Sequence, residues 1–151
     1  MTTILEVLAR ARLEGDPGRL SDAIPYARFM GITFDIAEKP TPAAVVGRLT
    51  YSNMLIGDPT VPALHGGTLG ALLESTAIFE LLWSAETLVI PKIINMTIEY
   101  LRPARPHDTF AWGIITKQGR RVANLRVEAW QSDPDQPIAI AFAHFLIQPE
   151  S

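Results

Sequence analysis

One stretch of this chain, residues 68–86, contains no proline, is rich in Leu and Ala, and is long enough to form a major helix. The chain around it has short runs of β-type sequence, which prolines, glycines and polar residues separate, as is typical of strands. These runs are residues 32–37 and 43–51 before the helix, and residues 92–101, 109–118, 121–131 and 138–147 after it. One long helix among such strands packs on a mostly antiparallel sheet, so the order predicts an α+β fold.

The first thirty residues have a different character. Apolar residues recur near helical spacing over residues 4–13, after a candidate cap at Thr2 or Thr3. A glycine- and proline-containing break follows, and a short helical turn is expected around residues 21–29. We therefore expect an N-terminal helical segment over 1–30 and a main unit over 31–151. The length of 151 residues fits one structural domain overall.

Composition and charge exclude several classes of function. The 13 Lys and Arg against 16 Asp and Glu give a net charge of −3, so no basic field attracts nucleic acid. The chain has no cysteine, which excludes disulfides, thiolate metal sites and a Cys nucleophile. The longest run without a charge, residues 59–73, is too short to span a bilayer, and the charged N-terminus is unlike a signal peptide. We expect a cytoplasmic protein with no nucleic-acid or membrane partner.

Glu74 is the unusual residue of the predicted helix. The residues that share its helical face are uncharged and mostly small: Gly67, Gly70, Ala71, Ala77, Ile78 and Leu81. Because a buried unpaired charge is costly, Glu74 faces either a cavity that the small residues leave open or a partly exposed seam. Glu80 and Glu86 are expected to be solvated, since Glu80 shares its face with Thr76 and Ser84 and Glu86 ends the helix.

The sequence His65-Gly66-Gly67 comes immediately before this helix. The first N–H groups of a helix have no acceptor within it, and the helix dipole favours an anion there, so this entry can hold an oxyanion. Taken alone, such a Gly-Gly entry is more often plain turn chemistry. No G-x-S-x-G, G-x-G-x-x-G or H-E-x-x-H pattern is present, and the three histidines lack ligand spacing. We expect no metal and no cofactor.

Residues 64–77, LHGGTLGALLESTA, resemble the signature of hotdog-fold acyl-CoA thioesterases of the PaaI-like group. In that group His-Gly-Gly opens the central helix and an acidic residue follows nine positions after the histidine. Residues 95–104 are similar to the family's next strand with its Tyr-Leu-Arg-Pro turn, and residues 119–123 to its hairpin turn. The resemblance implies a hotdog fold, a curved antiparallel sheet wrapped around one long central helix. It also implies a homodimer or homotetramer with active sites at the dimer interface.

The resemblance further implies hydrolysis of an acyl-CoA thioester to free acid and CoA, the CoA moiety being part of the substrate. Glu74 would be the nucleophile or the general base. The Gly66 N–H would polarise the thioester carbonyl, and His65 would orient the thioester. Gly67 and Ile78 are expected to contact the substrate.

One position departs from the family pattern. Many relatives carry Asn or Gln six residues before the histidine, where this chain has Pro59. The nearest polar residue is Asp58, which we consider as a catalytic carboxylate that would repel the charge of Glu74. The alternative is a residue of a surface turn, because Gly-Asp-Pro is good turn chemistry.

Positive residues gather late in the chain and suggest a site for the CoA phosphates, to which Arg offers paired donors. They are Arg102 and Arg105, then Lys117, Arg120 and Arg121 around a predicted hairpin. The alternative is a solvated turn. On the predicted helix, Ile78, Leu81 and Leu82 indicate an apolar acyl chain or ring.

Two other functions stay open on a hotdog scaffold. An acyl-thioester hydratase or dehydratase would carry a histidine about fourteen residues before the helix Glu, where this chain has Thr60. A non-catalytic acyl-CoA binding module would not need to keep Glu74 together with the His-Gly-Gly entry.

Overall fold

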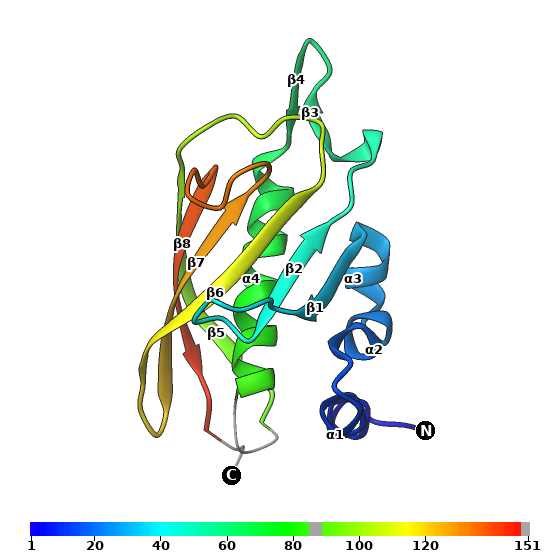
Figure 1. Ribbon diagram of the computed structural model, residues 1–151, viewed down its shortest axis with the longest axis vertical. Coiled ribbons are helices and arrows are strands. Elements are labelled where there is room, and N and C mark those ends of the chain that lie inside the picture. The colour runs from blue at the N-terminus through cyan, green and yellow to red at the C-terminus, as the bar shows by residue number, and fades with distance from the viewer. Residues whose placement is uncertain (85–88, 149–151) are drawn as a thin grey trace.

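The computed structural model describes residues 1–84 and 89–148, and in these residues a curved six-stranded sheet wraps around one long helix (Figure 1). The helix is α4 (Gly66–Ser84). The strands, in the order of the sheet, are β1 (Ile32–Ile36), β2 (Val45–Leu49), β6 (Thr109–Gln118), β7 (Val122–Trp130), β8 (Ala139–Leu146) and β5 (Lys92–Tyr100). All neighbouring pairs are antiparallel. The predicted α+β architecture is confirmed, and the predicted helical residues 85 and 86 lie outside the described residues.

Small residues on the inner face of the sheet let the helix come close. Buried alanines at 1% exposure or less recur on the inner face: Ala111, Ala123, Ala129, Ala139, Ala141 and Ala143. The approach is closest at Gly47 in β2, where an added Cβ would lie 2.7 Å from Thr76 Oγ1 and 2.9 Å from Phe34. Any larger residue at this position would clash with the Thr76 and Phe34 side chains and disturb the packing of α4 on the sheet.

The N-terminal segment forms three helices, α1 (Ile4–Glu14), α2 (Pro17–Asp22) and α3 (Pro25–Met30). Thr3 caps α1 as one of the two expected candidates: its hydroxyl accepts from the Glu6 N–H, and the Glu6 carboxylate accepts from the Thr3 N–H. The single turn expected around residues 21–29 is two short helices, each with proline at its first position. α2 and α3 lie beside β1 (Figure 1), and their buried side chains join the core of the sheet.

A small hairpin, β3 (Ile56–Asp58) and β4 (Val61–Leu64), stands above the start of α4 in Figure 1. It follows a short 3₁₀ helix, η1 (Asn53–Leu55). The sequence did not predict this hairpin, because its strands are very short and Pro62 lies within one of them.

Glu80 corrects a prediction. It was expected to be solvated, but it is 3% exposed. Its carboxylate accepts hydrogen bonds from the Ala44 N–H at 2.9 and 3.0 Å, from the Val45 N–H at 3.1 Å and from the Ser84 hydroxyl. Burial raises the pKa of Glu80, against the lowering effect of these hydrogen bonds. Glu86 lies outside the described residues.

Within the described residues, none of the helices combines the length and the apolar content needed to cross a membrane.

Candidate active site

The entry to α4 is fixed by hydrogen bonds on both sides of His65. The Leu64 N–H donates to the Ala104 carbonyl at 2.9 Å, and the His65 N–H donates to the Leu55 carbonyl at 2.8 Å. His65 then caps the helix, because its Nδ1 accepts from the Gly67 N–H at 2.9 Å and its carbonyl accepts from Thr68. The Gly67 N–H is therefore occupied. Among the described residues nothing accepts a hydrogen bond from the Gly66 N–H, which leaves that donor available to a ligand.

Tyr100 supports this entry from the end of β5. Its hydroxyl donates to the Gly66 carbonyl at 2.9 Å. Its ring is so close that a Cβ at residue 66 would lie 3.2 Å from Tyr100 Cζ, so glycine suits this position best. Tyr100 belongs to a stretch that resembles a family motif, but no role was predicted for it from the sequence. Its contact with Gly66 spans 34 residues of chain, which no local pattern reveals.

Glu74 lines a cavity of about 560 Å³ on the outer side of α4. The lining comprises Gly67, Gly70, Ala71, Glu74, Ser75, Ile78 and Phe79 from α4, Ile24, Tyr26 and Ala27 at α3, and Met96 from β5. Of the two expectations for the small residues near Glu74, an open cavity and an exposed seam, the structure has the cavity. Gly67 and Ile78 were predicted from the sequence to contact the substrate, whereas Ser75, Met96 and the residues at α3 were not.

Asp58 lies in the β3–β4 hairpin and is not one of the residues that line the cavity. Its carboxylate accepts from the Thr60 hydroxyl at 2.7 Å and the Thr60 N–H at 2.8 Å, and these bonds lower the pKa of Asp58. This is the geometry of a surface turn, the second of the two interpretations of Asp58. Within one chain the structure gives Asp58 no contact with Glu74.

Comparison with known proteins decides the family. Residues 62–138 match the model of the thioesterase superfamily. A Chromobacterium violaceum protein of known structure is 38% identical, over 95% of this chain and 98% of that chain, with a TM-score of 0.75. The chain belongs to the thioesterase superfamily. Its curved sheet and central helix are the hotdog fold that the sequence predicted, and the protein is a thioester hydrolase.

Two further relatives of this thioesterase are more distant. The medium/long-chain acyl-CoA thioesterase YigI of Salmonella typhimurium is 26% identical over 139 residues, covering 82% of this chain and 86% of that protein. A phenylacetic acid degradation-related protein of Ralstonia eutropha JMP134 is 20% identical, over 93% of this chain and 99% of that chain, with a TM-score of 0.74. The second shows a likeness of fold.

The basic residues predicted to bind the CoA phosphates lie in two separate parts of the thioesterase. Arg102 follows Tyr100, at the end of the sheet where Tyr100 pairs with Ala139 and contacts Gly66. The β6–β7 hairpin carries Lys117, Arg120 and Arg121 and lies at the other end, where Val122 and Lys92 both pair with Leu146. The sequence predicted that these basic residues gather at one site. Within one chain this prediction is wrong. Figure 1 shows this hairpin at the lower left, far from the upper end of α4.

In the described ranges 1–84 and 89–148, no three His, Asp or Glu residues are grouped as metal ligands. The groups in this region that can act on a thioester are the Glu74 carboxylate, in a mostly apolar cavity, and the Gly66 N–H at the N-terminus of α4.

Proposed function

We propose that this thioesterase hydrolyses an acyl-CoA to a free acid and CoA, with Glu74 as the base or the nucleophile. The observation that carries the proposal is the position of Glu74, the one carboxylate among the described residues that line the 560 Å³ cavity beside α4. The Salmonella relative is an acyl-CoA thioesterase, which supports acyl-CoA as the substrate class. The His-Gly-Gly entry supports assignment to the PaaI-like group. We also propose, as the sequence led us to expect, that the enzyme is cytoplasmic and uses no cofactor.

The proposed chemistry follows from the charge that develops on the substrate. The Gly66 N–H and the α4 N-terminus stabilise the oxyanion that forms when the thioester carbonyl is attacked. As a base, Glu74 takes a proton from water while the water oxygen bonds to the carbonyl carbon. As a nucleophile, its carboxylate bonds to that carbon first, and water then cleaves the anhydride. In both cases the carbon–sulfur bond breaks and the CoA sulfur leaves as a thiolate, which takes up a proton.

This chemistry calls for a second copy of the chain. Gly66 and Glu74 are eight residues apart on one helix, which separates their backbones by about 12 Å along the axis. Both groups must come close to the same thioester carbonyl, at about 3–3.5 Å for reacting atoms. We infer that Gly66 of one copy and Glu74 of another act on the same thioester.

The edge strand β5 offers the surface for this pairing. β5 has a neighbour on one side, β8, and its Ile93 and Ile94 are 39% and 54% exposed. An edge with unpaired backbone groups and apolar side chains favours pairing with another strand. Antiparallel pairing of two β5 strands about a two-fold axis sets the Lys92 end of one beside the Tyr100 end of the other.

The protein is therefore expected to be at least a dimer. A variant whose β5 edge is blocked should lose both dimerisation and activity. Ile94→Lys places a charge on this edge, so light scattering should show more monomer and the assay less turnover. Leu13→Lys, on the 88% exposed Leu13 of α1, is the matched control and should leave both unchanged. A stable, fully active monomer of 16.6 kDa would contradict the proposed pairing.

The same pairing would let the basic hairpin, which is the β6–β7 hairpin with Lys117, Arg120 and Arg121, bind the CoA phosphates. It brings Arg120 and Arg121 of one copy to the end of the sheet where the other copy has Gly66 and Tyr100. CoA carries a pyrophosphate and a ribose phosphate, and arginine binds such groups with paired hydrogen bonds. We propose that this hairpin holds the phosphates across the dimer.

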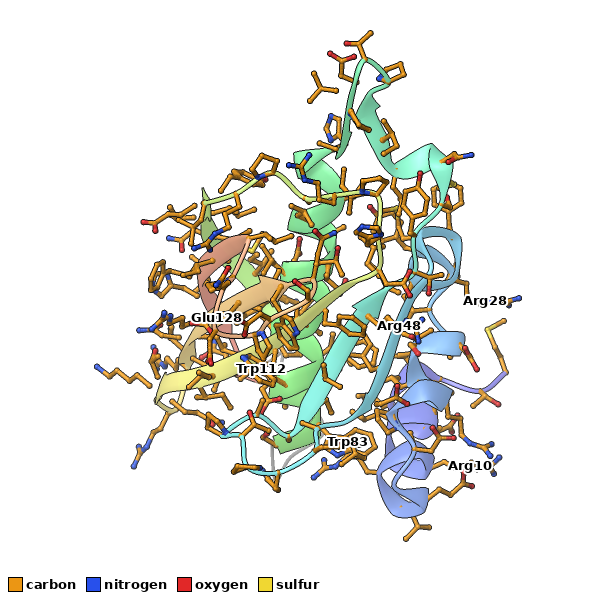
Figure 2. All side chains as sticks on the ribbon, turned by 45° about the horizontal axis from the view of Figure 1, so that its top comes forward. Arg10, Arg28, Arg48, Trp83, Trp112 and Glu128 are labelled. Carbon is orange, nitrogen blue, oxygen red and sulfur yellow. The ribbon has the colours of Figure 1, made fainter. Side chains whose placement is uncertain are left out.

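If so, salt weakens CoA binding but not the chemical step. Exposed contacts are screened as the Debye length falls to about 8 Å at physiological salt, so KM for acyl-CoA should rise with salt while kcat changes little. Arg120→Ala with Arg121→Ala should raise KM and flatten this salt dependence in steady-state kinetics. Arg10→Ala with Arg28→Ala removes the same charge from the N-terminal helices (Figure 2) and is the control. A wild-type KM and salt slope in the hairpin variant would place the phosphates elsewhere.

The proposed function is tested by following thiol release from a panel of acyl-CoAs, from short aliphatic to aryl, with purified protein. Release of free thiol is expected. A hydratase would instead add water to an unsaturated acyl-CoA and leave the thioester intact, and a binding module would bind acyl-CoA without turnover. Either of these results contradicts hydrolysis.

A further inference from the structure

We infer that α3 forms one wall of the acyl-binding cavity and that Tyr26 limits the length of the acyl group the enzyme accepts. The inference rests on the proposed function, since it assumes that the thioester lies at Glu74. The observation is that residues from two distant parts of the chain line one cavity. Ile24, Tyr26 and Ala27 line the same cavity as Glu74 and Ile78.

The three α3 residues contribute different parts of the wall. Ala27 is 4% exposed and Ile24 is half-buried against the core, so these two side chains lie at the closed side of the cavity. Tyr26 lines the same cavity but is 55% exposed, which places its ring at the open side. An acyl chain that extends from Glu74 between the two helices therefore meets the Tyr26 ring where it leaves the cavity.

The wall is held firmly against the rest of the protein. Proline at the first position of α3 and Gly31 in the left-handed region after its last residue, at φ 76°, define both ends of the helix. Ala27 and Met30 are buried in the core that the sheet and α4 share. Below the cavity, the rings of Phe34 in β1 and Phe79 in α4 stack at 3.8 Å and 10°. The distance between α3 and α4 is thus set by packing.

The lining also indicates the class of acyl group. Its polar side-chain groups are the Glu74 carboxylate, the Ser75 hydroxyl and the Tyr26 phenol, and the other lining residues are apolar or glycine. None of the described lining residues is a cation, so an acyl group with a second carboxylate would find no partner and would be repelled by Glu74. The volume lies within the roughly 300–1,000 Å³ of small-molecule sites. We assign the cavity to a neutral, apolar acyl group.

The test is the acyl-length profile of Tyr26 variants. Thiol release is measured with straight-chain acyl-CoAs from butyryl to palmitoyl, and kcat and KM are determined for each. Tyr26→Ala removes the ring that a long acyl chain meets where it leaves the cavity, so the ratio of kcat/KM for long over short acyl groups should rise about tenfold or more, the size of one methylene contact. Tyr26→Trp should lower the same ratio. For the short acyl groups, kcat should change little, because Tyr26 does not touch the reacting carbon.

Phe29→Ala is the matched control, since Phe29 is an aromatic residue of the same helix, is 68% exposed and is not among the residues that line the cavity. Its profile should equal that of the wild type. Two results for Tyr26→Ala would contradict the proposed role of Tyr26 without affecting the proposed hydrolysis. One is an unchanged acyl-length profile, and the other is a fall in kcat/KM by one common factor for every acyl length. A wild-type protein that releases no thiol from any member of the series overturns both proposals.

Discussion

Glu74→Gln is expected to lower kcat for acyl-CoA hydrolysis by roughly 10²–10⁴-fold, the usual contribution of a positioned base. The amide keeps the shape of the carboxyl group but neither removes a proton from water nor forms an anhydride. The side chain lies at a cavity and not in the packed core, so the fold should be preserved. Thiol release under saturating substrate measures the loss, and thermal unfolding verifies that the variant is folded.

Glu128→Gln is the matched control for this experiment. It makes the same chemical change on the outer face of the sheet, where Glu128 forms an ion pair with Arg126 and lies beside Trp112 in Figure 2. Such a partly exposed pair contributes little to stability, so activity and folding should both stay near those of the wild type. A folded Glu74→Gln protein that keeps most of its turnover would remove Glu74 from the mechanism.

The second large effect is expected at Glu80 and concerns stability. Glu80→Ala removes the acceptor of the Ala44 and Val45 N–H groups, and each buried donor left unsatisfied costs roughly 1–3 kcal/mol. The free energy of unfolding, measured with a chemical denaturant, should therefore fall by about 2–5 kcal/mol. Glu80→Gln keeps one carbonyl oxygen at this position and should lose less. An unchanged unfolding midpoint in Glu80→Ala would show that these hydrogen bonds contribute nothing.

Glu80 also predicts how stability depends on pH. Burial raises the pKa of this carboxyl in the folded protein above its ordinary value of 4.5. Below that value it is protonated in both states, and its contribution to stability is fully present. As the pH rises through the folded pKa, the unfolded chain loses its proton more readily, and this contribution is lost. The stability of the wild type relative to Glu80→Gln should thus decrease as the pH is raised from below 4.5. A constant difference would contradict the raised pKa.

The elements that sequence reasoning predicted well are those with local signals. A cap at Thr2 or Thr3, the long proline-free helix and the six main strands all follow from patterns within a few residues; the structure has the helix and the strands, and the cap is Thr3. The interpretation of Glu80 failed because its partners, Ala44 and Val45, are 36 and 35 residues away. Its helical neighbours Thr76 and Ser84 look polar, yet the face they share is turned towards β2.

The candidate site divides in the same way. The small residues around Glu74 lie on one helix, so their spacing predicted either an open cavity or a partly exposed seam, and the structure has a cavity. The contribution of Tyr26 depends on where α3 packs, which is set by buried contacts far along the chain. The position of the basic hairpin depends on the order of strands in the sheet, and sequence proximity of Arg102 to Lys117 gave the wrong expectation.

The position of α2 beside β1 has a consequence for assembly. In the described six-stranded sheet β1 is the edge opposite β5, and α2 comes so close to it that a Cβ at Gly18 would lie 3.6 Å from the Phe34 carbonyl oxygen. A strand from another molecule cannot easily add where a helix already lies, so growth by strand addition is confined to β5. Two copies joined symmetrically at β5 consume that edge in each other. In the proposed dimer, strand pairing is therefore self-terminating, and further growth of this sheet would first require the N-terminal helices to detach from β1.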